Sequence, residues 1–167
     1  MGRRANRYAV VLVTALAWLV LDQLSKAYIT AHVAPGQFFT VVPGCFDIVH
    51  VRNHGAAFGF LNNAGTTWQI WLFLAAALIV FALVLRLVRS SAYSFPLFVG
   101  LGSLLGGAAG NIVDRGRSMA VTDFLDVYWG SLHWPAFNVA DIAICLGVAV
   151  SGIVLLLQDR REKSGRA

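Results

Sequence analysis

Charge is scarce in this sequence. Only 13% of its 167 residues are Asp, Glu, Lys or Arg, and 58% are hydrophobic, whereas roughly 25% of the residues in soluble domains are charged. No long polar block interrupts the chain, which excludes a separate soluble catalytic domain. We therefore predict an all-α polytopic membrane protein in which residues 1–167 form a single integral membrane domain.

Cysteine is also scarce, and the histidines form no ligand pattern. Cys45 stands in a polar stretch and Cys145 in an apolar run, which argues against a disulfide framework and a zinc knuckle. None of the four histidines stands beside Cys or Glu in a metal-ligand pattern. The sequence also lacks a P-loop, a Ser-x-x-Lys motif and a nucleophile elbow. We expect no metal, no cofactor and no serine-based chemistry.

The net charge of +5 does not indicate nucleic acid binding. The basic residues gather beyond the ends of apolar runs, whereas a nucleic-acid site would have them along one polar face. Four of these runs reach the roughly 20 residues that a membrane span requires. They cover residues 8–29, 68–87, 95–113 and 137–157.

An even number of spans places both termini on one side of the membrane. Most of the 13 Lys and Arg residues belong to that side, so the positive-inside rule predicts cytoplasmic termini. They are Arg3, Arg4, Arg7, Arg86, Arg89, Arg160, Arg161, Lys163 and Arg166. No small-x-small cleavage pattern follows the N-terminal apolar run at the expected place, so we interpret the run as an uncleaved span, not as a secretory signal.

The segment of residues 36–61 is too polar to span a membrane. Its Val, Ile and Phe residues on both sides of Pro43 and Gly44 are typical of two short strands and a turn. Because unpaired backbone donors are not tolerated in lipid, we expect a small β-patch at the outer surface. Residues around 119–129 are candidates to join it.

Glycine recurs every fourth residue in the third apolar run, at Gly102, Gly106 and Gly110. Small residues at this spacing allow another helix backbone to approach closely. We interpret the stripe as a helix-packing face, with a cleft for an extended ligand as the alternative.

Most of the eight acidic residues lie at or beyond the outer ends of the spans, where a carboxylate close to lipid is costly. They are Asp22, Asp47, Asp114, Asp123, Asp126 and Asp141. Asp123 follows the third span and Asp141 begins the fourth, so folding could bring them together. Two neighbouring carboxylates share a proton, and one can then activate water while its protonated partner polarises a carbonyl. This is aspartyl protease chemistry.

Helix geometry offers a structural explanation for two of these positions. Asn138 and Asp141 have the spacing of a capping box at a helix N-terminus. Asp22 lies four residues before Lys26, as in a helical ion pair. Both explanations remain open beside the catalytic one.

The other acids also have structural explanations. Asp114 could anchor the end of the third span and form a local ion pair with Arg115. Asp123 and Asp126, three residues apart, could face water above the bilayer. The sequence alone leaves these alternatives open.

Five sequence blocks resemble the bacterial lipoprotein signal peptidases (signal peptidase II) in order and spacing along nearly the whole chain. One such block would be weak support, but five at family-like spacing are specific. The blocks are Asp22-Gln-Leu-Ser-Lys26, Asn53-His-Gly-Ala-Ala-Phe58, Gly106-Gly-Ala-Ala-Gly-Asn111-Ile-Val-Asp114-Arg115, Val121-Thr-Asp123-Phe-Leu-Asp126 and Phe137-Asn138-Val-Ala-Asp141.

The resemblance implies a plasma-membrane aspartyl endopeptidase with four transmembrane helices and a small periplasmic β-cradle. Such an enzyme cuts a prolipoprotein just before its diacylglyceryl-modified cysteine. The implied partners are diacylglyceryl prolipoproteins, membrane lipid and inhibitors of the globomycin type, which are cyclic peptides. We expect a monomer.

The resemblance also implies roles for individual residues. Asp123 and Asp141 match the catalytic pair. Positions that line the site and hold the substrate backbone are matched by Asn53, Asn111, Arg115 and Asn138. Supporting polar positions are matched by Asp22, Lys26, Asp114 and Asp126. His54 departs from the family pattern, which often has threonine there, and the change could alter local titration or contacts with a substrate lid.

Two other classes of function compete with the protease. A small proton- or cation-coupled carrier would also place acids in a membrane, but these acids gather near one surface and the sequence shows no inverted repeat. A noncatalytic assembly subunit could use the glycine stripe for packing. The gathering of acids near one surface favours the protease.

Overall fold

The computed structural model describes residues 2–55, 68–90 and 94–164. These residues form four helices, all long and apolar enough to cross a membrane, and one small antiparallel sheet. The fold predicted from the sequence is therefore confirmed. The elements in chain order are α1 Gly2–His32, β1 Phe38–Val42, β2 Phe46–Asn53, α2 Trp68–Ser90, α3 Phe95–Ser118, β3 Val121–Trp129, β4 Leu132–His133 and α4 Val139–Ser164.

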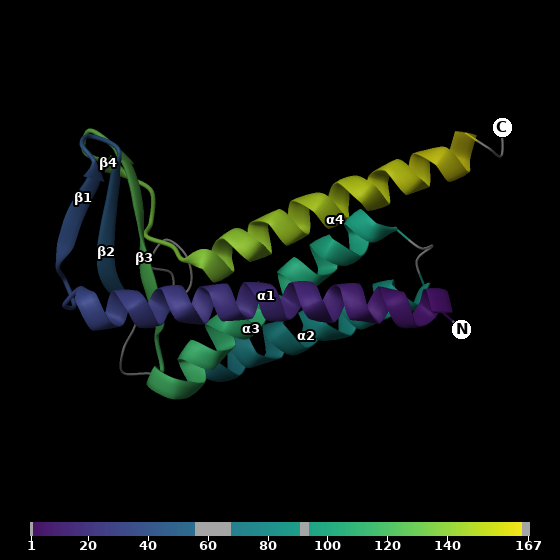
Figure 1. Ribbon diagram of the computed structural model, residues 1–167, viewed down its shortest axis with the longest axis horizontal. Helices are drawn as coiled ribbons and strands as arrows, with labels where there is room; N and C mark the ends of the chain where they lie inside the picture. Colours follow the sequence, from purple (N-terminus) through teal and green to yellow (C-terminus); the bar gives the residue numbers. More distant parts are fainter. Residues whose placement is uncertain (1, 56–67, 91–93, 165–167) are drawn as a thin grey trace.

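Figure 1 shows the sheet at one end of the helix bundle and both termini at the opposite end. We call these the sheet end and the terminal end. α3 packs against α1, α2 and α4, and its residues Leu97, Phe98 and Leu101 are almost fully buried near the terminal end. The two termini therefore lie at the same end, as an even number of spans requires.

The glycine stripe of α3 packs against α1. A Cβ atom at Gly102 would lie 2.7 Å from the Val11 carbonyl oxygen, and one at Gly106 would lie 2.9 Å from Trp18 Cβ. Side chains at these positions would push the two helices apart. The helix-packing interpretation of the stripe is thus confirmed.

The sheet has the strand order β1-β2-β3-β4. β1 and β2 form the predicted hairpin, whose turn contains Gly44 at a φ of 84°. β3 pairs with β2, which confirms that residues around 119–129 join the patch. Residues 56–61 of the predicted patch lie outside the described part of the chain.

Two short connections bring the helix ends close to β3. After α3, Met119 adopts a left-handed conformation with a φ of 60°, and its N–H donates to the Arg115 carbonyl. Before α4, Phe137 pairs with β3, since its N–H donates to the Leu125 carbonyl at 3.0 Å. This pairing explains why α4 begins at Val139, later than predicted.

Candidate active site

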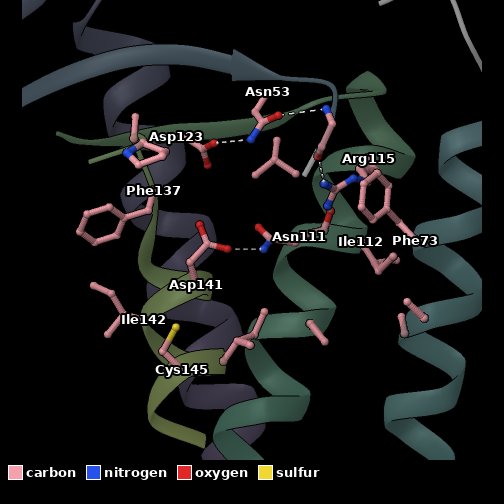
Figure 2. Close-up of a pocket in the computed structure, with 18 of the residues that line it drawn as sticks. Asn53, Phe73, Asn111, Ile112, Arg115, Asp123, Phe137, Asp141, Ile142 and Cys145 are labelled. Atoms are coloured by element: carbon pink, nitrogen blue, oxygen red, sulfur yellow. Dashed lines mark hydrogen bonds between the residues drawn. The ribbon is translucent and has the colours of Figure 1, made fainter. Parts of the chain in front are cut away.

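A cavity of about 650 Å³ lies between α2, α3, α4 and β3. Helix α2 contributes apolar residues to its wall, among them Phe73 and Val80. Figure 2 shows the polar side chains grouped on the side of the strands. Polar residues that line the cavity are Asn53, Asn111, Arg115, Asp123 and Asp141. The fold thus brings together five of the residues singled out in the sequence.

Asp123, the third residue of β3, is only 3% exposed. Its Oδ2 accepts a hydrogen bond from Asn53 Nδ2 at 2.9 Å, and its Oδ1 accepts one from Asn138 Nδ2 at 2.7 Å. Burial raises the pKa of Asp123 from 3.8 to about 6; the amide of Asn53 opposes the rise and the charge of Asp141 adds to it. A carboxyl group with such a pKa can exchange a proton near neutral pH.

A reciprocal capping box holds Asp141 in the first turn of α4. The Asp141 N–H donates to Asn138 Oδ1 at 3.0 Å, and the Asn138 N–H donates to Asp141 Oδ2 at 3.1 Å. Asn111 Nδ2 also donates to Asp141 Oδ1 at 2.9 Å. The predicted capping box is confirmed, and it holds the carboxylate near the positive end of the helix dipole.

The two carboxylates reach the same cavity from different elements, as Figure 2 shows. Asn138 connects them, because its side-chain amide donates to Asp123 and its backbone N–H donates to the Asp141 carboxylate. It is fully buried, with 0% exposure. A pair of carboxylates in one largely apolar cavity can activate a water molecule and protonate a carbonyl oxygen.

Arg115 also contributes to the cavity wall. Its Nη2 donates to the Gly55 carbonyl at 2.7 Å, and its guanidinium lies 3.8 Å from the centre of the Phe73 ring. The alternative of an Asp114–Arg115 ion pair, which the sequence left open, is not what the structure has, because adjacent residues on a helix point in different directions. Asp114 Oδ2 instead lies 2.9 Å from Lys26 Nζ.

A buried polar cluster on α1 and α3 lies behind the carboxylates. Lys26 Nζ donates to Asp22 Oδ2 at 2.9 Å and to Asn111 Oδ1 at 3.1 Å, in addition to its contact with Asp114. The predicted Asp22–Lys26 pair is confirmed, with exposures of 0% and 4%. Asp22 Oδ1 also accepts the backbone N–H of Ala140 at 2.9 Å. The cluster therefore reaches the first turn of α4.

Asp126 lies outside the cavity that holds Asp123 and Asp141. Its Oδ2 lies 2.9 Å from Nδ1 of His133 on β4, and it does not line the cavity. His54 follows β2 and is half-buried. Asp126 therefore pairs with β4, away from the two carboxylates that line the cavity.

Several residues in and around the site were not singled out from the sequence, and three of them make informative contacts. Gln23 Nε2 donates to Asp114 Oδ1 at 2.9 Å, and Phe73 and Cys145 line the cavity. Gln23 could have been found as a polar residue inside an apolar run. Phe73 and Cys145 look like ordinary span residues, and no sequence pattern marks them.

Metal-ligand side chains are not clustered in the described part of the chain. No group of three or more His, Cys, Asp or Glu side chains there could hold a metal ion. Cys45 and Cys145 are free thiols. The polar groups that reach the cavity are carboxylates, amides and a guanidinium.

Comparisons with known proteins give matches along most of the chain. The family model of signal peptidase II matches residues 14–157. The lipoprotein signal peptidase of Nitratidesulfovibrio vulgaris is 44% identical over 160 residues, which cover 96% of this chain and 97% of that protein. The lipoprotein signal peptidase of Oleidesulfovibrio alaskensis is 48% identical over 141 residues, 84% of this chain and 90% of that protein.

A solved structure agrees over most of the chain. A bacterial membrane enzyme determined by the in meso method at 2.3 Å resolution has a TM-score of 0.79 and 29% sequence identity, covering 93% of this chain and 92% of that one. These similarities do not support the alternative of a small carrier.

Proposed function

The chain belongs to the signal peptidase II family, and from this premise we propose that Asp123 and Asp141 are its catalytic pair. The family consists of membrane proteases that remove signal peptides from prolipoproteins. The observation that supports the assignment is the convergence of these two carboxylates, from β3 and α4, on one cavity. Each is held by a side-chain amide.

In the proposed resting state, Asp123 holds the proton that the pair shares. It is almost completely buried, and burial raises its pKa to about 6. Asp141 lies at the N-terminus of α4, where the helix dipole stabilises a negative charge. Asp141 is therefore the base that activates water, and Asp123 is the acid.

The proposed reaction has two proton-balanced steps. Water gives a proton to Asp141 while its oxygen attacks the scissile carbonyl carbon, and Asp123 protonates the carbonyl oxygen to form a gem-diol. The C–N bond then breaks as Asp141 protonates the leaving amine and Asp123 recovers a proton from one hydroxyl. The pair ends with one proton, as it began. General acid–base catalysis of this kind contributes about 10²–10⁴-fold to a rate.

The proposed substrate is a prolipoprotein cut just before its diacylglyceryl-modified cysteine. Acyl chains on that cysteine stay in the bilayer, so the scissile bond reaches the enzyme only near the membrane surface. The cavity suits such a bond because its polar groups lie beside β3, while Phe73, Val80 and Ile144 supply apolar walls between the helices.

Roles for the remaining polar residues follow from their burial. Arg115 and Asn111 line the cavity and are proposed to bind substrate carbonyls, which must not stay unpaired near hydrocarbon. Asn138 is fully buried, so we assign it to holding Asp123 and Asn111 and not to contacting the substrate.

The test is cleavage of a lipidated preprolipoprotein by purified Asp123→Asn and Asp141→Asn proteins. Each change should lower kcat by about 10³-fold and leave the fold intact. Asp47→Asn, the same change on the neighbouring strand β2 and outside the cavity, should keep wild-type turnover. Folded Asp123→Asn or Asp141→Asn protein that cleaves at the wild-type rate would overturn the assignment.

Substrate presentation is tested with precursors that have or lack the diacylglyceryl group. Only the lipidated precursor should be cut efficiently, and equal turnover of the two would contradict the proposed substrate. We further propose that globomycin-type cyclic peptides occupy the same cavity and that the protein acts as a monomer.

The proposed location is the bacterial inner membrane, with cytoplasmic termini and a periplasmic sheet. The support is the excess of Lys and Arg at the terminal end, which the positive-inside rule assigns to the cytoplasm. In a variant without its natural cysteines, a thiol at Ser90 should resist a membrane-impermeant reagent in intact cells, whereas one at Thr40 should react. The reverse labelling would overturn this orientation.

A further inference from the structure

Lys26 does not line the cavity, yet it hydrogen-bonds to an amide that does. Its Nζ donates to Asn111 Oδ1 at 3.1 Å, and Asn111 Nδ2 donates to Asp141 Oδ1 at 2.9 Å. We propose that Lys26 is a positioning residue that fixes the orientation of the Asn111 carboxamide and thereby the Asp141 carboxylate. This inference rests on the proposed catalytic role of Asp141.

The chemistry of the ammonium group makes this orientation compulsory. An ammonium only donates hydrogen bonds, and it has three N–H groups. Three oxygens surround Lys26 Nζ: Asp22 Oδ2 and Asp114 Oδ2 at 2.9 Å, and Asn111 Oδ1 at 3.1 Å. If the Asn111 carboxamide turned over, its NH₂ group would face the ammonium, donor against donor. Lys26 therefore directs the amide nitrogen toward Asp141.

Asn138 extends the same arrangement to the second carboxylate. Its Nδ2 lies 3.3 Å from Asn111 Oδ1 and 2.7 Å from Asp123 Oδ1. The Asn111 oxygen thus accepts from Lys26 and from Asn138, which leaves only its nitrogen for Asp141. One buried cation consequently orients the amide of Asn111 that holds Asp141 and, through it, one of the two amides that hold Asp123.

Burial leaves little water to replace these contacts. Lys26 is 4% exposed and Asp22 is 0% exposed. Asp22 Oδ1 also accepts the N–H of Ala140, the residue before Asp141. Polar networks in such surroundings hold a single geometry only when every member has its partner. Loss of the ammonium should therefore loosen the Asp141 carboxylate.

The decisive variant is Lys26→Gln combined with Asp114→Asn. Glutamine fills much of the lysine site, but its amide both donates and accepts, so it pairs equally well with either orientation of Asn111. Asp114→Asn removes one carboxylate along with the cation, which keeps the net charge of the cluster the same as in the wild type. The variant therefore removes the directional contact and leaves the local charge balance unchanged.

The expected result is a kcat about 10- to 100-fold lower, as small misplacements of catalytic groups produce, with KM within twofold of the wild type. In an Asn111→Ala background the same two changes should lower kcat by less than twofold, because Lys26 acts through Asn111. A wild-type kcat, or an equal drop in both backgrounds, would overturn the inference.

If the double variant does not accumulate as folded protein, the kcat of the Lys26→Arg variant tests the inference instead. Arginine also has only donors, so it should keep kcat within about threefold of the wild type; a tenfold lower kcat at unchanged KM would sink the inference. Lys163→Gln, in an exposed Asp–Lys pair of the same spacing, is the matched control and should have no effect. Active Asp141→Asn protein would instead refute the proposed catalytic role of Asp141. The two experiments therefore distinguish a failure of the inference about Lys26 from a failure of the proposed function.

Discussion

The two ends of the helix bundle differ in the interactions that predominate between the helices. At the terminal end, α1, α2 and α3 share an apolar cluster, in which Phe98 and Leu101 are at most 1% exposed. At the sheet end, α1, α3 and α4 meet through buried charges and amides around Lys26. Apolar packing thus predominates at the terminal end, where Arg7 also donates to the Val88 carbonyl. The sheet end combines the polar cluster with a smaller apolar cluster of Ile29, Val33 and Phe124.

This difference indicates that the terminal end serves mainly the stability of the fold and that the sheet end serves mainly its function. An apolar cluster tolerates replacement by side chains of similar volume, so the terminal end needs only the right size and polarity. A buried ion cluster is rarely the most stable choice, and apolar residues often replace one without loss of stability. Its presence beside Asp123 and Asp141 is explained by the orientation it imposes on the amides that hold them.

The largest expected effect is that of Lys26→Met at the sheet end. The change leaves the carboxylates of Asp22 and Asp114 buried without their cation, which typically destabilises a protein by about 3–5 kcal/mol. Thermal unfolding in detergent should show a much lower melting temperature. Adding Asp114→Asn should recover part of the loss. An unchanged melting temperature for Lys26→Met would contradict the view that the sheet end depends on a buried ion cluster.

Phe98→Ala tests the terminal end. Phe98 is 0% exposed, and truncating a buried phenylalanine costs about 3 kcal/mol or more. The melting temperature should fall, but the folded protein should keep wild-type kcat and KM because the cavity lies at the other end. A kcat that falls in parallel with stability would show that the two ends are not independent.

Local patterns in the sequence predicted much of this architecture. Apolar runs predicted the four helices because a span must be apolar along its whole length. The capping box of Asn138 and Asp141, and the ion pair of Asp22 and Lys26, involve residues within one helical turn. Spacing along the chain is sufficient to predict such contacts.

Contacts between distant segments could not be predicted in this way. Lys26 has partners 85 and 88 residues away, at Asn111 and Asp114, and no local spacing indicates them. An ion pair of Asp114 with its neighbour Arg115 was one alternative, but the helix turns the two side chains in different directions. The convergence of Asp123 and Asp141 was expected from their places at the ends of neighbouring spans and from the family resemblance. The pairing of Phe137, just before α4, with β3 supplies its physical cause.

A smaller effect is expected from Asn53→Ala, within the sheet end. Asn53 Nδ2 donates to Asp123, and this hydrogen bond lowers a carboxyl pKa that burial has raised to about 6. Without the bond the pKa rises further, so Asp123 keeps its proton to higher pH. The alkaline limb of the kcat/KM profile, expected near pH 6 in the wild type, should move to higher pH. A limb that stays in place or moves down would contradict Asp123 as the acid.

The smallest expected effect is that of Lys163→Met, the counterpart of Lys26→Met at the terminal end. Lys163 and Asp159 have the same four-residue spacing as Lys26 and Asp22, and their contact is shorter, 2.7 Å against 2.9 Å. Distance alone would make it the stronger pair. However, the Lys163 side chain is 76% exposed, and exposed helical pairs contribute only about 0.3–0.5 kcal/mol. Melting temperature and turnover should therefore match the wild type, since burial and the number of partners decide what an ion pair contributes; a clear loss would contradict this.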